Sequence, residues 1–449
     1  MSETVEKAGE TKLVADTDPN HLKENYGYKA AFQTWRHASN ARENESKLLS
    51  SALRWFPNGD KTRFCEILDV DIDGKNHIHE FYIENKEVAS NKTQCRDMVM
   101  VHGYGAALGL FMRNFDELSE VAGIRIHAID MLGYGLSSRP KFPGTGFLSS
   151  LVKRGNVAPA EVTQAEDFFV DSIEAWRKKR NLKKFVLVGH SLGGYLSCCY
   201  ALKYPDKVEK LILVSPVGVE TSIYDLTRKH SKEHVHAAEL GPDVSKEITN
   251  SGETPSTDKR VANSSTTTTP TSSPPKSSSL HVPDDSGNVE RIPNMPKIFT
   301  YMWTYNISPF SFLRALGPIG PLASSRWSFR RFSFAENSQE LLRFHEYCYS
   351  SFTATGSGEY ALTRILAPGV LARLPLLSRV PGKLQCPSLW MYGSNDWMSK
   401  EAGSVIVREL NKQSGSSPAE YSIIPDAGHH LYLDNPSAFN SRLKRFLGV

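Results

Sequence analysis

Apolar residues occur along this chain in two arrangements, as short continuous runs and as longer stretches with helical spacing. The runs at residues 98–101, 185–188 and 210–214 predict strands buried on both faces, because they leave no polar face for water. The stretch 163–180 has apolar side chains three and four positions apart, which predicts an amphipathic helix. Strands that alternate with helices indicate a mostly parallel sheet covered on both faces, an α/β fold.

Further segments fit the same architecture. Strand-like rhythm at 63–70 and 77–83 predicts an antiparallel opening hairpin. The pattern also predicts strands at 125–130, 387–393 and 421–424 and helices at 28–53, 110–121 and 437–447. Asn435 is the expected N-cap of the last helix and Pro436 its first residue, since the amide oxygen can accept an unused backbone N–H and proline needs no acceptor there.

Breaks in this alternation predict the domain organisation. We expect an N-terminal extension over 1–60, disordered to about residue 25, a first core part over 61–222, an inserted lid over 223–384 and a second core part over 385–449. Within the insertion, residues 264–279 are almost wholly Thr, Ser and Pro and cannot bury apolar area. We therefore expect a disordered Ser/Thr/Pro loop at about 250–286, followed by an aromatic and partly helical lid.

Composition and charge narrow the classes of protein. The 449 residues carry 53 Lys and Arg against 49 Asp and Glu, a net charge of +4, which gives no argument for a nucleic-acid partner. The six cysteines form no C-x-x-C pair and no zinc-like spacing, so no metal and no cofactor is expected, and their usage suits a reducing compartment. There is no run of about 20 apolar residues for a membrane-spanning helix. The first 20 residues resemble neither a secretory signal nor a typical transit peptide.

The strongest chemical signal is the pentapeptide Gly-His-Ser-Leu-Gly at residues 189–193. It follows an apolar strand and precedes a helical run, which is the context of a nucleophile elbow. The sharp turn lifts the hydroxyl of Ser191 above the sheet edge, at a helix N-terminus whose N–H groups favour developing negative charge. Ser191 is therefore the candidate nucleophile, and a glycine-rich turn without chemistry is the alternative.

A serine needs a base within hydrogen-bond reach, and the base needs an acid to orient it. His429 and Asp396 each follow a predicted strand, where the carboxyl ends of parallel strands place functional side chains. The order Ser191, Asp396, His429 matches the nucleophile–acid–base order expected after such an elbow. His430 is an alternative base, and Asp426 an alternative acid that is awkwardly close to His429 in sequence.

Two backbone N–H groups are expected to form an oxyanion hole. One belongs to Leu192, directly after the nucleophile, and the other to the loop 102–105, His-Gly-Tyr-Gly. Tyr104 is the favoured donor in that loop and Gly105 the alternative. Residues 130–137 are expected to form a second tight turn beside the site, with a structural role.

Together these motifs resemble the α/β-hydrolase superfamily and, within it, the α/β-hydrolase-domain 4 and 5 branch with its fungal relatives, which include the cardiolipin-specific deacylase. The resemblance covers about 96–222 and 296–449 and rests on the segments 102–105, 130–137, 189–193, 200–214, 391–398 and 425–436. It implies an α/β-hydrolase fold with acyl-ester chemistry on phospholipids and lysophospholipids, cardiolipin-type lipids among them. A coactivator-type member of the branch has Asn at the nucleophile position, whereas this chain has Ser191.

The branch also carries an H-x4-D motif that is linked to lysophosphatidic acid acyltransferase activity, and here it comprises His429 and Asp434. Since His429 is already the candidate base, and Asp434 precedes a helix start where a carboxylate is favourable, the motif has a structural reading too. Acyl transfer from acyl-CoA, a possible second partner, remains the alternative to hydrolysis.

The lid combines aromatic and basic side chains, which suit a lipid surface and anionic headgroups. The candidates for this surface are Trp327, Phe329, Arg326, Arg330 and Arg331. The alternative is that the aromatics form the lid core and the arginines its solvated face. The expected location is intracellular and peripheral to a membrane, either mitochondrial or at lipid droplets and in the cytosol.

Three functions compete at this point. The first is a serine lipase for phospholipid acyl chains, the second a lysophospholipid acyltransferase, and the third a non-catalytic scaffold on a lipid surface. Haloalkane and epoxide hydrolysis are disfavoured, because those reactions need a carboxylate at the elbow where this chain has Ser191.

Overall fold

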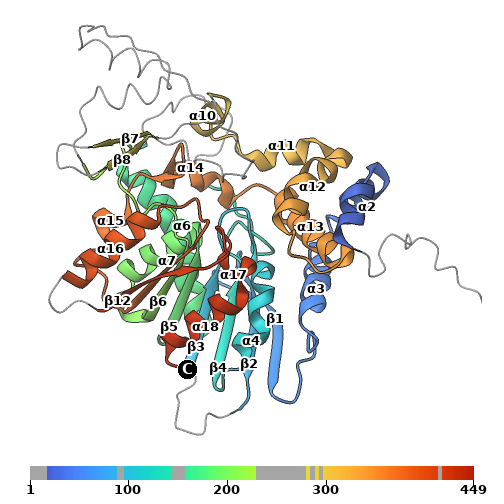
Figure 1. Cartoon of the computed structure of the whole chain (residues 1–449), viewed down its shortest axis with the longest axis horizontal. Helices are drawn as coiled ribbons and strands as arrows, with labels where there is room; N and C mark the ends of the chain where they lie inside the picture. The colour runs from blue at the N-terminus through green and yellow to red at the C-terminus, as the bar shows by residue number, and fades with distance from the viewer. Residues whose placement is uncertain are drawn as a thin grey trace, which may run out of the picture.

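The computed structural model describes residues 18–87, 96–143, 157–228, 280–283, 289–292, 297–412 and 417–449. Its centre is an eight-stranded sheet (Figure 1). Across the sheet the order is β1 (Arg63–Asp71), β2 (His77–Asn85), β4 (Ile124–Ile129), β3 (Arg96–Val101), β5 (Phe185–His190), β6 (Val208–Val214), β11 (Ser388–Gly393) and β12 (Ala419–Ile424). The first three strands pair antiparallel, and all further pairs are parallel. The predicted α/β fold is confirmed.

Helices cover both faces of the sheet, which accounts for the continuously apolar strands. One face packs against α3 (Ala41–Ala52), α4 (Met112–Ser119) and α18 (Pro436–Leu447), and the other against α6 (Pro159–Lys179), α7 (Leu192–Lys203) and α16 (Lys400–Lys412). Alternate residues of β3 divide between the two cores: Met98 and Met100 join one, Val99 and Val101 the other. As predicted, Asn435 caps α18 by accepting the N–H of Ala438, with Pro436 at the first position.

The described part of the inserted segment forms a mostly helical lid beyond the carboxyl ends of the strands (Figure 1). Its helices are α10 (Lys297–Thr304), α11 (Pro309–Ala315), α12 (Gly320–Arg331), α13 (Ser338–Thr353), α14 (Leu362–Ile365) and α15 (Leu376–Arg379). Short segments complete the description: the strand pairs β7 (Leu280–Pro283) with β8 (Val289–Ile292) and β9 (Leu366–Ala367) with β10 (Leu371–Ala372), the helix α17 (Leu431–Asp434), and 3-10 turns at Leu108–Phe111, Pro205–Lys207, Gly317–Ile319 and Gly358–Ala361.

The N-terminal extension differs from the expectation in two ways. The predicted helix at 28–53 is two helices, α2 (Tyr28–His37) and α3, because Ser39 and Asn40 favour a turn between them. The segment expected to be disordered to residue 25 contains α1 (Pro19–Asn25), whose Leu22 is buried among core residues. All three helices pack against the lid helices α12 and α13, so the extension is part of the lid assembly (Figure 1).

Two expectations fall largely outside the described residues. The segment 1–17 is outside them, and so is most of the Ser/Thr/Pro loop expected at 250–286, of which only β7 is described. Among the helices that are described, none has the length and apolar composition needed to cross a membrane.

Candidate active site

Ser191 lies between the last residue of β5 and the first residue of α7, as the elbow motif predicts. Its backbone has φ 55° and ψ −117°, a conformation that non-glycine residues rarely adopt. The turn leaves no room for side chains on its flanking glycines. A Cβ on Gly193 would lie 2.2 Å from the carbonyl oxygen of His102, and one on Gly189 would lie 2.4 Å from the hydroxyl of Ser197. Both glycines are therefore required by the close packing of β5, α7 and the loop after β3.

The three predicted triad residues meet at the carboxyl edge of the sheet. The hydroxyl of Ser191 lies 3.0 Å from Nε2 of His429, and Nδ1 of His429 lies 3.2 Å from a carboxylate oxygen of Asp396. If Nδ1 donates its proton to Asp396, Nε2 is left as the acceptor for the serine proton. This hydrogen-bonded relay joins three loops that follow β5, β11 and β12.

Asp396 is buried and held by three donors. Burial alone would raise its pKa, but hydrogen bonds from His429, from the hydroxyl of Ser215 and from the backbone N–H of Met398 outweigh it, so the pKa lies below the ordinary carboxyl value. Ser215 was not among the predicted site residues. It directly follows β6, with φ 45°, and this position at a strand's carboxyl end is the signal that could have identified it.

His190, the residue before the nucleophile, is a second group that the motif analysis missed. Its ring is buried between the rings of His429 and His430, at centroid distances of 4.8 and 4.9 Å. Burial lowers the pKa of His190 well below the ordinary value, so the imidazole is neutral at pH 7. Its Nε2 donates to the carbonyl oxygen of His429 at 3.0 Å and thereby fixes the backbone that carries the candidate base.

The alternatives for acid and base are resolved by these contacts. Asp396, and not Asp426, is the carboxylate hydrogen-bonded to His429. His429, and not His430, is the histidine hydrogen-bonded to Ser191, and Nδ1 of His430 instead accepts a hydrogen bond from Nε–H of Arg331 at 3.2 Å. Burial also lowers the pKa of His430 well below its usual range.

Of the two predicted oxyanion donors, Leu192 follows Ser191 directly, and Tyr104 belongs to a loop that passes close to Ser191. Leu192 is the first residue of α7, so its N–H has no acceptor within the helix. The loop after β3 passes so close that a Cβ on Gly103 would lie 2.9 Å from Cβ of Ser191. Tyr104 follows in this loop, and its ring stacks on Phe310 of the lid with centroids 5.3 Å apart. The lid therefore covers the loop that carries the second donor.

The turn at 130–137 supports this loop, as its structural reading predicts. One carboxylate oxygen of the buried Asp130 accepts the N–H of Leu108, and the other accepts the N–H of Leu136, each at 2.7 Å. Because Leu108 follows the oxyanion loop, Asp130 ties that loop to the turn after β4.

Asp434 of the H-x4-D motif lies at the end of α17 and does not contact the reacting groups of the triad directly. One oxygen accepts the N–H of Gly428 at 2.9 Å, and the other accepts Nη1 of Arg331, also at 2.9 Å. Gly428 precedes His429 in the chain. The carboxylate therefore holds the backbone beside the candidate base and joins it to the end of the lid helix α12.

The lid residues predicted to face lipid divide into two groups. Trp327, Arg326 and Arg330 are exposed on α12. The prediction is wrong for Phe329 and Arg331. Phe329 is 5% exposed and packs against Tyr26 and His345, because this side of α12 faces the N-terminal helices and α13. Arg331 is turned inward to Asp434.

One cluster among the described residues has the composition of a metal site, namely Glu45, His79 and Asp130. Burial would lower the pKa of His79, but its contacts with Glu45 and Asp69 outweigh burial and raise it to about 10. Nε2 of His79 lies 2.8 Å from a carboxylate oxygen of Glu45, and Nδ1 lies 2.7 Å from one of Asp69, so His79 joins α3 to the sheet through ion pairs.

Comparison with known proteins agrees with this geometry. The family model described as alpha/beta hydrolase fold matches residues 98–436, and the chain belongs to this family. A probable 1-acylglycerol-3-phosphate O-acyltransferase of Oryza sativa is 31% identical over 87% of this chain and 72% of its own length. The 1-acylglycerol-3-phosphate O-acyltransferase ICT1 of Saccharomyces cerevisiae is 31% identical over 82% of this chain and 86% of its own length. The human (lyso)-N-acylphosphatidylethanolamine lipase is 30% identical over 77% of each chain. Within the family, these relatives place the chain among enzymes that hydrolyse or transfer lipid acyl groups.

Proposed function

We propose that this protein is a serine hydrolase that removes a fatty acyl chain from an anionic phospholipid through an acyl-enzyme intermediate. The observation that carries the proposal is the continuous hydrogen-bonded relay from Ser191 through His429 to Asp396. Such a relay activates a hydroxyl that is a poor nucleophile at its free pKa.

In the first half-reaction, Oγ of Ser191 bonds to the ester carbonyl carbon while its proton moves to Nε2 of His429. The N–H groups of Leu192 and Tyr104 hold the resulting oxyanion. When the intermediate collapses, the carbon–oxygen bond to the lysophospholipid breaks, and the leaving oxygen takes the proton from His429. Asp396 keeps the imidazole in the required tautomer and stabilises the transient imidazolium.

In the second half-reaction, the oxygen of water or of a lipid hydroxyl bonds to the acyl carbon while His429 takes its proton. The bond from the acyl carbon to Oγ of Ser191 then breaks, and Oγ takes the proton back from His429. Water gives hydrolysis and releases a fatty acid. A lysophospholipid hydroxyl gives acyl transfer, with an acyl-CoA or a phospholipid as the acyl donor. Two of the relatives are named as acyltransferases for 1-acylglycerol-3-phosphate, and this supports transfer as the second candidate function.

A lipid substrate is supported by the lid. Four aromatic rings, those of Tyr104, Phe310, Phe352 and Trp327, follow one another from the oxyanion loop to the lid surface at centroid distances of 5.3, 4.9 and 5.5 Å. Trp327 is 40% exposed, with Arg326 and Arg330 on the same helix. An exposed ring beside cations suits a peripheral contact with an anionic membrane or lipid-droplet surface.

None of the three relatives reported above is named for cardiolipin, so cardiolipin is one anionic candidate among several. A mitochondrial location rests on the sequence resemblance alone.

The test is to incubate the purified chain with a phospholipid and lysophospholipid panel, with and without acyl-CoA, and to identify the products by mass. We expect a free fatty acid and a lysophospholipid, and a fall of at least about 10⁴-fold in turnover for Ser191→Ala. No product from either the native chain or the variant would favour a non-catalytic scaffold on a lipid surface, and equal turnover in the two would refute Ser191 as the nucleophile. A lysolipid product that becomes acylated only with acyl-CoA would favour the transferase.

A further inference from the structure

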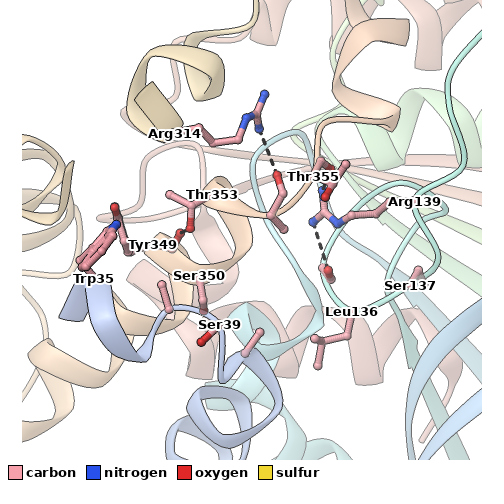
Figure 2. Close-up of a pocket in the computed structure, with 14 residues that line it drawn as sticks. Trp35, Ser39, Leu136, Ser137, Arg139, Arg314, Tyr349, Ser350, Thr353 and Thr355 are labelled. Carbon is pink, nitrogen blue, oxygen red and sulfur yellow. Dashed lines mark hydrogen bonds between the residues drawn. The ribbon is translucent and has the colours of Figure 1, made fainter. Parts of the chain in front are cut away.

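A pocket of about 680 Å³ lies between the N-terminal helix α2, the turn after β4 and the lid (Figure 2). Trp35 lines it from α2, Leu136 and Arg139 from the turn, and Arg314 and Thr355 from the lid. None of its lining residues belongs to the triad or to the oxyanion loop. Its volume is within the range of small-molecule sites.

The charges in this pocket are of one sign. Its lining residues include two arginines and no Asp or Glu. The charge of Arg314 is balanced by Glu359, a buried residue that is not part of the pocket lining. Nη2 of Arg314 donates to the Glu359 carboxylate at 2.7 Å. No carboxylate of the described residues forms such a pair with Arg139.

Arg139 is held by backbone oxygens instead. Its Nη1 donates to the carbonyl oxygen of Thr355 at 2.8 Å, and its Nη2 donates to those of Gly135 and Ser351 at 3.1 and 3.4 Å. These contacts fix the orientation of the guanidinium but supply no negative charge. Two of its five N–H groups have no acceptor among the described residues, and the same holds for the hydroxyl of Thr355.

An unneutralised cation in such a place is costly. Burial lowers the pKa of Arg139 below the ordinary arginine value, against the attraction of the more distant Asp130 and Glu359. Taking a cation even partly out of water is unfavourable when no partner charge replaces the lost solvent. An anion that enters the pocket would recover part of this cost, and the rigid guanidinium suits the oxygens of a phosphate group.

We propose that this pocket binds the phosphate group of a phosphate monoester, with Arg139 as the principal cation. A phosphate monoester carries nearly two negative charges and three acceptor oxygens, which matches the free donors of Arg139 and Thr355. The organic part would lie against the apolar wall of Trp35 and Leu136. The inference does not depend on the proposed acyl chemistry, since it concerns binding alone.

The experiment measures thermal unfolding and isothermal binding of the full chain at constant ionic strength, with glycerol 3-phosphate, inorganic phosphate or glycerol. We expect a saturable rise in Tm with glycerol 3-phosphate, a smaller one with inorganic phosphate, and none with glycerol. Equal effects of the two phosphates would identify free phosphate as the source. The absence of a saturable rise with either would overturn the proposal.

Two variants test the role of Arg139. Arg139→Gln removes the charge but can also loosen the turn, so Ser39→Glu provides a second measurement. Ser39 lines the pocket from an exposed position after α2, and a carboxylate there would supply the missing charge from within the chain. We expect Ser39→Glu to keep its fold and to weaken glycerol 3-phosphate binding by about tenfold or more.

The matched control is Arg408→Gln, which removes an exposed arginine of α16 outside the pocket and is expected to bind as the native chain does. Native affinity in Ser39→Glu would overturn the proposal. Because no turnover is involved, phosphate binding and acyl hydrolysis can each fail while the other succeeds. Loss of hydrolysis in the panel experiment would leave this binding result unchanged.

Discussion

Arg331 on the lid helix α12 forms an ion pair with Asp434, 2.9 Å long, beside the loop of the candidate base His429. The other oxygen of Asp434 accepts the backbone N–H that immediately precedes His429. A single carboxylate therefore joins the lid to the backbone of the candidate base, and we propose that the aspartate of the H-x4-D motif has a positioning role.

Asp434→Asn is expected to lower hydrolysis and any acyl transfer in parallel, by about tenfold, because the loss of a charged hydrogen bond costs roughly 1.5–3 kcal/mol. Both rates are measured on the same preparation, with Asp426→Asn as a control in the neighbouring turn. Loss of transfer with intact hydrolysis would contradict the positioning role and assign Asp434 to the acyl acceptor.

Ser215→Ala is expected to lower turnover about tenfold and the free energy of unfolding by about 1–3 kcal/mol, because one oxygen of the buried Asp396 would lose its donor. Steady-state kinetics on a soluble ester and urea unfolding measure the two effects. Ser399→Ala, which removes a hydroxyl that accepts the N–H of Ala402 at the start of α16, is the control for a serine outside the triad. Native turnover in Ser215→Ala would show that His429 and Met398 suffice to hold the carboxylate.

Gly103→Ala is expected to reduce turnover strongly with little change in KM for a small ester. The new methyl would lie 2.9 Å from Cβ of Ser191 and 3.0 Å from Nδ1 of His190, so the nucleophile or the oxyanion loop must shift. A displacement of about 1 Å can cost 10²-fold in rate. Gly27→Ala is the control, since its nearest atom would be 4.0 Å away. Equal turnover in both variants would refute the close approach.

Stability is expected to fall as the pH falls below about 6.5, with His345 as one cause. Burial lowers the pKa of His345 to about 3, whereas an unfolded histidine titrates near 6.5. Between these values the unfolded chain binds a proton that the folded chain does not. Each such group therefore removes about 1.4 kcal/mol of unfolding free energy per pH unit.

Urea unfolding between pH 7 and pH 4 measures this slope. His345→Asn is expected to be less stable at pH 7, because His345 contacts the hydroxyls of Tyr26 and Ser328 at 2.9 and 2.7 Å. The unfolding free energy of this variant should nevertheless change less steeply with pH than that of the native chain. The difference in slope should correspond to about one proton. An unchanged slope in His345→Asn would contradict the assignment.

The double variant Arg326→Glu and Arg330→Glu is expected to weaken binding to anionic vesicles, because both exposed arginines flank Trp327 on α12. Hydrolysis of a soluble ester should remain at the native rate. The pair Lys178→Glu and Arg408→Glu reverses the same number of exposed charges on α6 and α16 and serves as control. Unchanged vesicle binding in the lid variant would contradict the proposal that these arginines contact anionic lipid headgroups.

Much of the fold could be predicted because its signals are local. A continuously apolar strand such as β5 must be covered on both faces wherever it occurs, and the glycines around Ser191 describe a sharp turn without reference to distant residues. The position of Ser215 at the end of β6 could mark it as a candidate site residue, but its partner Asp396 could not be predicted in this way. This contact depends on β6 lying next to β11, a pairing between strands separated by the whole lid insertion.

The sequence by itself determined the α/β architecture, the elbow at Ser191 and the order of the candidate triad, because periodicity and turn chemistry act over a few residues. Only the tertiary structure decided that Asp396 rather than Asp426 contacts His429, and that Arg331 faces Asp434 instead of a lipid surface. It also decided that Phe329 is core and Trp327 surface, although both belong to one helix. These outcomes depend on which distant segments pack together. Contacts between side chains about 30 to 300 residues apart in the sequence cannot be predicted from the local residue pattern.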